Sequence, residues 1–215
     1  MFFFKIFITF ILFFILFLGK FLDTTSSPKK VDTIFALGGY ENFRIIKALN
    51  LLNQGFSTSN KIFQLSTLKQ QLWLVRKDIK VKNIIQNSKQ IEFTVNLSNT
   101  MQELKYIEKI LNKNKYKSFI IVTDPSHSRR VDFLIKNYTN IKDNYKYNII
   151  SSEPIWWNKN FYFLNLKALG TSILEIFKIL HNYTKYSLIQ NSSTIKYLDY
   201  ISNTTKSYLH KKFGF

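Results

Sequence analysis

The stretch of residues 119–130 constrains the fold more than any other part of the chain. It opens with four apolar, mostly β-branched residues, which is typical of a strand that is buried on both faces. Asp124 and Pro125 then end this strand, because proline cannot continue a central strand. Beyond it, apolar residues recur at helical spacing at Val131, Leu134, Ile135 and Tyr138. A buried strand that leads directly into a helix is typical of parallel α/β sheets, which place their ligands at such turns.

The polar residues on this turn are Ser126, His127, Arg129 and Arg130. The chain has 31 basic residues, of which only four are arginines. Arginine is required for planar, two-pronged contact with phosphate or carboxylate, whereas lysine satisfies most surface positions. Two adjacent arginines in so lysine-rich a chain therefore predict an anion site. We expect Arg129 to face this site and Arg130 to pair elsewhere, because neighbours on a helix diverge by about 100°.

Asp124 has two interpretations. Its carboxylate can cap the helix that follows, and the proline after it is favoured at the first helical position. Alternatively, the carboxylate belongs to the site and orients His127. We regard His127 as the best candidate for a general acid or base, because imidazole titrates near neutral pH. The sequence leaves both interpretations of Asp124 open.

The composition excludes several kinds of chemistry. Cysteine is absent, which excludes disulfides, thiol nucleophiles and zinc–thiolate sites. The three histidines are far apart in the sequence, so we expect no metal site and no cofactor. The net charge is +18, but the lysines are spread along the whole chain and no nucleic-acid-binding motif is visible. We therefore expect no nucleic acid as partner and favour an anionic membrane or a phosphorylated ligand.

The first 22 residues predict a transmembrane signal anchor. An apolar run extends from Ile6 to Leu18, with Thr9 as its only polar member, and the whole segment is near the lower limit of about 17–25 residues for a spanning helix. No small-residue cleavage site follows, which argues against a cleaved signal peptide. Residues 23–30 are typical of a linker. Lysines on both sides of the apolar run leave its orientation open.

Strand–helix units follow the linker. We predict strands at residues 33–37, 61–65, 119–122 and 147–150, one or two short strands within 79–95, and helices at about 67–76, from about 99, after 125 and at 165–183. Gly38 and Gly39 follow the first of these strands, where glycines let backbone amides approach a phosphate. A tight turn is the competing interpretation of this pair. Arg44 lies one helical turn further on and could reach the same anion.

The helix near residue 100 opens with Asn99, Thr100 and Glu103. Thr100 and Glu103 have the spacing of a capping box, so a purely structural role competes with a role in the site. Further on, Trp156 and Trp157 predict burial of apolar surface more than stacking on a ligand.

The last part of the chain divides at about residue 183. An amphipathic helix at 165–183 carries an apolar face, with Glu175 and Lys178 on another face. The residues of that apolar face are Leu169, Ile173, Ile176 and Leu180. Residues 184–215 form a basic, aromatic extension that we expect to be helical. This extension either packs on the domain or lies on a membrane surface.

The order of these motifs resembles the YdcF/SanA/ElyC-like family, known as domain of unknown function 218. The resemblance covers roughly residues 31–183. It rests on these elements in order: the strand before Gly38-Gly39, Arg44, Asn99-Thr100-x-x-Glu103, Val122-Thr123-Asp124-x-x-His127-x-Arg129-Arg130, Trp156-Trp157 and Glu175. The chain departs from the family at Leu104, where asparagine is common, and at Leu65-Ser66-Thr67, where the family has Ser-Gly-Gly.

The resemblance implies a Rossmann-like, three-layer α/β domain with a mostly parallel sheet after one N-terminal transmembrane helix. It also implies a single-pass protein of the bacterial inner membrane, with its globular domain in the periplasm and a role in envelope or peptidoglycan maintenance. The residues expected at the carboxyl ends of the strands are Gly38, Gly39, Arg44, Asn99, Thr100, Glu103, Asp124, His127, Arg129 and Arg130. Ser66 and Glu175 are expected behind them.

The expected ligand bears a phosphate group, as a polyprenyl-phosphate carrier or a cell-wall precursor does. Such a ligand would supply the anion for the arginines, and the anchor would hold the site near it. Whether a reaction follows binding is left open by the sequence. The alternatives are a non-catalytic envelope factor that binds a partner protein and a binder of nucleotides or methyl donors.

Overall fold

The computed structural model describes residues 16–39, 41–66, 90–94 and 97–188, together with residues 200 and 204. The chain forms two compact units. One unit spans Thr25–Pro154 and contains the sheet. The other combines the chain before residue 25 with the chain after residue 154.

The first unit is built on a five-stranded sheet, and every strand pair that it contains is parallel. Its strands are β1 (Thr33–Ala36), β2 (Ile62–Leu65), β3 (Ile91–Thr94), β4 (Ser118–Thr123) and β5 (Lys146–Ser151). They lie in the order β3-β2-β1-β4-β5. The expected Rossmann-like α/β fold with a parallel sheet is confirmed, and the strands of the first unit match the predicted ones closely.

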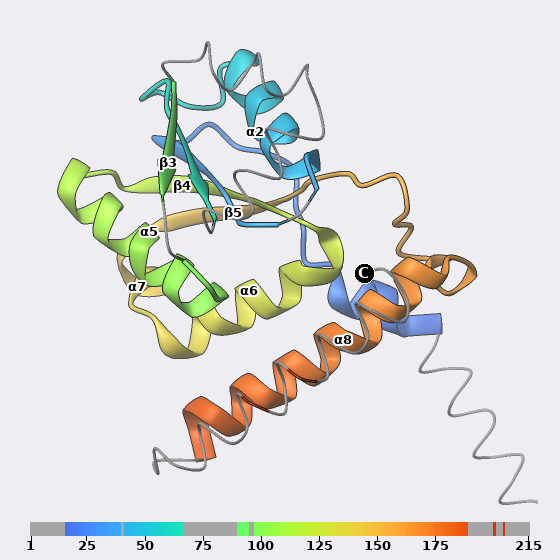
Figure 1. The fold of residues 1–215 in the computed structure, drawn as a ribbon. Helices are drawn as coiled ribbons and strands as arrows, with labels where there is room; N and C mark the ends of the chain where they lie inside the picture. Colours follow the sequence, from blue (N-terminus) through green and yellow to red (C-terminus); the bar gives the residue numbers. More distant parts are fainter. Residues whose placement is uncertain are drawn as a thin grey trace, which may run out of the picture. The chain divides into compact units, whose positions relative to one another are not determined.

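Helices cover both faces of this sheet (Figure 1). One face packs against α2 (Phe43–Asn53). The other face packs against α5 (Thr100–Asn114), α6 (Pro125–Tyr138) and the short α7 (Ile141–Asn144). The side chains alternate accordingly: Phe35 of β1 faces α5 and α6, whereas Ile34 faces α2. Because both faces are buried, the strands read as continuous apolar runs.

The strand order reverses between β1 and β4. From β1 the chain builds outward through β2 to β3, and α5 then carries it back to β4, on the other side of β1. In doubly wound sheets, ligands bind beyond the carboxyl ends of the two strands at this reversal. The fold therefore directs attention to the turns after Ala36 and Thr123.

The second unit contains a helix over residues 16–22, the 3-10 turn η1 (Tyr162–Leu164), α8 (Leu166–Tyr183) and the π-helical turn η2 (Thr184–Leu188). Leu18 and Leu22 are buried in one cluster with Tyr162 and Ala168. Gly19 allows this close approach, because a Cβ atom there would lie 2.3 Å from the carbonyl oxygen of Lys159.

Some predictions differ from the structure or lie outside it. The domain expected over 31–183 differs from the compact unit, which ends at Pro154. Most of the predicted anchor (residues 1–15), the helix at 67–76 and most of the extension after 188 lie outside the described residues. Among the described residues, no helix combines the length and the hydropathy that a membrane span requires.

The predicted apolar face of α8 is wrong in part. Leu169 and Ile176 pack on the cluster of the second unit, but Ile173 and Leu180 are exposed. Glu175, which we expected on another face, is instead buried. Its carboxylate accepts a hydrogen bond from Lys178 at 2.7 Å, which compensates the charge.

Replacing Phe35 by alanine tests the packing between the sheet and α5. The Phe35 ring is fully buried, with its centroid 5.1 Å from that of Phe63 and 5.7 Å from that of Phe119. We expect Phe35→Ala to lower the free energy of unfolding by roughly 3–5 kcal/mol in urea denaturation, because it leaves a cavity. Ile46→Ala, at an exposed position on α2, is the control and should cost less than about 1 kcal/mol. Equal losses would contradict the assigned core.

Candidate functional site

The turns after β1 and β4 lie side by side. Parallel pairing continues one residue beyond β1, where the Leu37 amide donates to the Val122 carbonyl at 3.1 Å. β1 then runs into Gly38-Gly39, and β4 runs into Asp124 and Pro125, the first residue of α6. The residues predicted on these two turns therefore meet at the strand reversal.

Arg44 and Asp124 form a two-pronged ion pair across this junction. The Arg44 Nε donates to Asp124 Oδ1 at 3.1 Å and Nη2 donates to Oδ2 at 2.5 Å, while Nη1 donates to the Gly38 carbonyl. Ser152, just beyond β5, donates its hydroxyl to Asp124 Oδ1 at 2.6 Å. The Asp124 side chain makes no capping bond to α6. The interpretation of Asp124 as a cap alone is therefore wrong.

The surroundings of Asp124 keep it ionised. Burial by itself raises the pKa of a carboxyl, but the Arg44 charge and the hydrogen bonds from Arg44 and Ser152 outweigh it and hold the pKa of Asp124 below its usual value. The two-pronged contact of Arg44, which we expected for a ligand, is thus made to Asp124. Arg44 shapes the site by holding the β1 turn against the β4 turn.

Gly39 favours this arrangement because it leaves room for the Arg44 guanidinium. A Cβ atom at Gly39 would lie 3.2 Å from Cζ of Arg44 and would push against the guanidinium. The pair Gly38-Gly39 is therefore more than a tight turn. Gly38 presents its carbonyl to Arg44, and its amide binds a carboxylate from another helix.

That carboxylate belongs to Glu103. Its Oε1 accepts the Gly38 amide at 2.6 Å, and its side chain is buried, with the residue 7% exposed. The capping-box interpretation of Thr100 and Glu103 is wrong, because the N-cap of α5 is Asn99, one residue earlier than that motif requires. Asn99 Oδ1 accepts the Gln102 amide at 3.0 Å. Asn99, expected as a ligand-binding residue, has this capping role, whereas Glu103 reaches the site.

The pKa of Glu103 is raised. Burial is the main cause, and the Gly38 amide and the charges of Arg44 and Arg130 oppose it. The site therefore holds two carboxyl groups whose pKa values shift in opposite directions. Such a separation is typical of groups with different roles in proton transfer.

Thr100 of α5 contacts two side chains of α6, those of Arg130 and His127. The Arg130 Nη1 donates to the Thr100 hydroxyl at 2.9 Å, and the His127 Nε2 lies 3.4 Å from the same oxygen. The expectation that Arg130 pairs away from the site is wrong, because Arg130 reaches Thr100 of α5 and its charge acts on Glu103. The expected role of Arg129 stays a prediction. His127 is 6% exposed, and its backbone amide donates to the Asp124 carbonyl at 2.9 Å.

Several hydroxyl groups complete the junction. In the described part of the chain, the hydroxyls of Ser66, Thr123 and Ser126 are buried and lack a hydrogen-bond partner. Ser66 directly follows β2, and its expected place behind the site stays a prediction. Ser152 was missed by the sequence reasoning, although its place just after a predicted strand was a usable signal. Glu175 belongs to the second unit and pairs there with Lys178.

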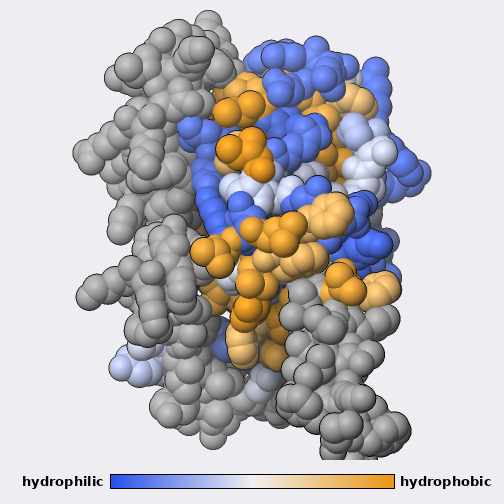
Figure 2. All heavy atoms as spheres, turned by 90° about the vertical axis from the view of Figure 1, so that its right-hand side faces the viewer, coloured by the Kyte–Doolittle hydropathy of each residue, from blue (hydrophilic) through white to orange (hydrophobic). Residues whose placement is uncertain are grey.

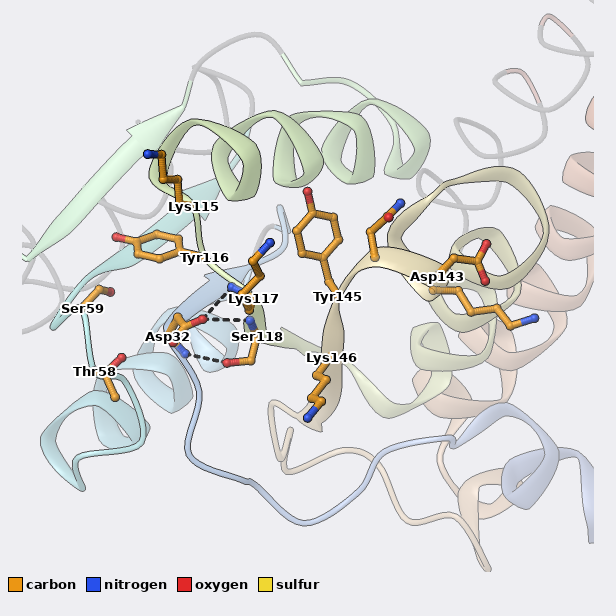
Figure 3. A pocket seen from close by; sticks show the side chains of 12 residues that line it. Asp32, Thr58, Ser59, Lys115, Tyr116, Lys117, Ser118, Asp143, Tyr145 and Lys146 are labelled. Atoms are coloured by element: carbon orange, nitrogen blue, oxygen red, sulfur yellow. Dashed lines mark hydrogen bonds between the residues drawn. The ribbon is translucent and has the colours of Figure 1, made fainter.

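A hollow lies at the opposite ends of the strands, where they begin (Figure 3). It measures about 800 Å³ and is lined by residues at the amino ends of β1, β4 and β5, several of them lysines. The Asp32 carboxylate in it accepts the amides of Lys117 at 2.7 Å and Ser118 at 2.9 Å. These bonds join β1 to β4 and leave Asp32 a structural role. We therefore place the site at the carboxyl ends of the strands.

Within the described ranges, no group of three or more His, Asp or Glu residues could hold a metal ion. Comparisons with models of known protein families, with curated proteins and with solved structures found no match. The resemblance to the YdcF-like family stays a prediction that rests on its motifs.

A double-mutant cycle tests whether Arg44 and Asp124 hold the junction together. Their side chains are 12% and 16% exposed, so removing one partner leaves a largely buried charge. We expect Arg44→Met to lower the free energy of unfolding by about 3 kcal/mol. Asp124→Asn should lower it less when Arg44 is already replaced than it does in the natural protein. The control is Lys47→Met with Glu153→Gln, an ion pair whose lysine lies on the same helix as Arg44 and whose glutamate is 67% exposed. This control pair should contribute at most about 1 kcal/mol.

The raised pKa of Glu103 predicts a pH-dependent stability. Between the usual value of 4.5 and the higher folded-state value, the folded protein binds more protons than the unfolded chain. Its free energy of unfolding therefore falls as the pH rises through this window. Glu103→Gln removes this term, so the variant should gain stability relative to the natural protein as the pH rises. Urea denaturation from acidic to neutral pH measures the difference, and Glu153→Gln is the control. A pH-independent difference for Glu103→Gln would contradict the assigned burial.

Proposed function

We propose that the α/β unit binds a phosphate-bearing ligand at the junction of the β1 and β4 turns. The observation that carries this proposal is the bond between the Gly38 amide and a carboxylate oxygen of Glu103. The turn already donates a backbone amide to a carboxyl oxygen, as turns between a first strand and its helix donate amides to phosphate oxygens. A ligand oxygen can take this place when the Glu103 side chain moves aside or is protonated.

Arg130 supports the same ligand class. Its guanidinium reaches Thr100 on α5, beside the imidazole of His127. A guanidinium suits the planar contact with a phosphate better than an ammonium group does. Arg44, by contrast, acts indirectly, because its two-pronged contact is made to Asp124.

We further propose that the protein is a single-pass component of a bacterial inner membrane, with the α/β unit in the periplasm. The apolar residues 1–22 and the motifs similar to the YdcF-like family support this setting. The ligand would then be a polyprenyl phosphate or a phosphorylated cell-wall precursor. For a reaction, His127 would be the general acid or base, with Glu103 as a second proton-transfer group.

A second candidate is a non-catalytic envelope factor that binds its ligand without turnover. The burial of His127 and Glu103 favours it, because neither side chain presents much surface to a substrate in this state. Replacing His127 by glutamine separates the two functions. An enzyme should lose turnover and keep its affinity for the ligand, whereas a binding protein should keep its function.

Ligand-induced thermal stabilisation tests the proposed ligand class. We expect inorganic phosphate or a short-chain polyprenyl phosphate to raise the melting temperature, and nucleotides or unphosphorylated wall fragments to have less effect. Arg130→Lys should weaken binding by about tenfold, the equivalent of roughly 1.4 kcal/mol, because the two-pronged contact is lost while the charge stays. Arg129→Lys is the matched control on the same turn. Equal affinities of both variants and the natural protein would argue against this site.

A further inference from the structure

Exposed apolar side chains are concentrated in the second unit. Among the described residues, the large hydrophobic side chains that are exposed include Ile155, Phe161, Leu164, Leu166, Ile173, Phe177 and Leu180. In the first unit, only Ile46 belongs to this group of exposed described residues. Figure 2 shows hydrophobic residues at the surface of the face that it draws. Concentrations of this kind mark interaction surfaces.

Helix α8 carries apolar side chains on two sides, because Leu169, Ile176 and Ile179 pack against the cluster of the second unit while three others face outward. Its buried positions are Ala168, Ser172 and Glu175, which are small or polar. Ile173, Phe177 and Leu180 follow one another at helical spacing and form a stripe that is 44%, 62% and 55% exposed. If the outer side of α8 contacted only water, we would expect polar residues there in place of this apolar stripe. We call these three residues the outer stripe of α8.

We propose that α8 lies in the interfacial layer of a lipid bilayer, parallel to the membrane plane, with its outer stripe toward the acyl chains. An amphipathic helix in this position buries its apolar side by several ångströms at the boundary between headgroups and acyl chains. The helix does not cross the membrane, because it carries Lys167, Glu175 and Lys178 and lacks the hydropathy of a span.

The composition of the second unit favours lipid as the occupant. Residues 16–22 belong to this unit and continue the most apolar segment of the sequence, and Leu18 and Leu22 pack with Tyr162 and Ala168. The unit that contains α8 is therefore covalently and structurally connected to the part of the chain best suited to a membrane.

Charge and aromatic residues of the same unit fit an anionic membrane surface. Residues 16–24 and 155–188 contain five lysines and two acidic residues. The Lys167 ammonium lies 4.9 Å from the ring centroid of Trp156. Tryptophan and tyrosine are enriched at the boundary between membrane and water, and lysines extend from there to the headgroups. Attraction to anionic lipids would add to the apolar contact of the outer stripe.

Single cysteines can test this directly, because the chain contains none of its own. Phe177→Cys and Leu180→Cys, each with a nitroxide label, report on the outer stripe in the full-length chain. The probe is vesicles of phosphatidylcholine with and without phosphatidylglycerol. The control is a label at Glu153→Cys, an exposed position in the first unit. Collision of the label with oxygen, which concentrates in acyl chains, is compared with collision with a water-soluble nickel complex.

We expect the ratio of oxygen to nickel collision to be several-fold higher at 177 and 180 than at 153. A ratio at 177 and 180 that equals the control would overturn the proposal. Labels that neither reagent reaches would overturn it too, because another segment of the chain or a second copy would then cover the stripe. The test uses the membrane setting of the proposed function but not its ligand site, so each proposal can fail without the other.

A second measurement avoids changes in the outer stripe. In a Trp73→Phe background, the remaining tryptophans are Trp156 and Trp157. Lipids with brominated acyl chains should quench their fluorescence strongly if the second unit lies in the interface. Quenching no greater than that of a tryptophan model compound in water would contradict the assignment.

Discussion

The ion pair between Arg44 and Asp124 is the contact on which the candidate site depends. It joins the first turn of α2 to the N-cap of α6, and thereby connects helices on opposite faces of the sheet. The same guanidinium holds the Gly38 carbonyl, and the same carboxylate accepts the hydroxyl of Ser152. Four segments therefore meet around one neutral, largely buried pair. In such a place the Coulomb attraction is strong, but it must offset the cost of removing two charges from water.

Two carboxyl groups meet different conditions at this junction. Asp124 has a full positive charge and two kinds of donor beside it, so its pKa falls despite burial. Glu103 accepts the Gly38 amide and is near the charges of Arg44 and Arg130, but burial outweighs these effects and its pKa rises. The Gly38 turn is thus held at its carbonyl by a permanent cation and at its amide by a group that can change protonation. This difference makes the amide side the adaptable part of the site.

The two units differ in how much of their apolar surface they bury. The first unit buries its apolar residues in two clusters on either side of the sheet, and its polar groups converge where the strand order reverses. The second unit has a small cluster around Tyr162 and leaves the outer stripe of α8 exposed. So small a core contributes little free energy of folding in water. This is the physical reason to look for an apolar partner outside the chain.

The sequence by itself determined the strands and helices of the first unit and the ends of the strands at which polar residues gather. Strands buried on both faces and helices with one apolar face carry their pattern in neighbouring residues, so the turn around His127 could be located without a structure. Only the tertiary structure decided which side chains meet. Glu103 binds an amide 65 positions away, and Arg44 pairs with Asp124 80 positions away, because the strand order places these segments together. The contact of Arg130 with Thr100 depends on how α6 is rotated against α5, and the burial of Glu175 depends on what packs on α8. The spacing of apolar residues along the chain cannot predict the rotation of α6 or the packing on α8, since both follow from contacts between segments far apart in the sequence.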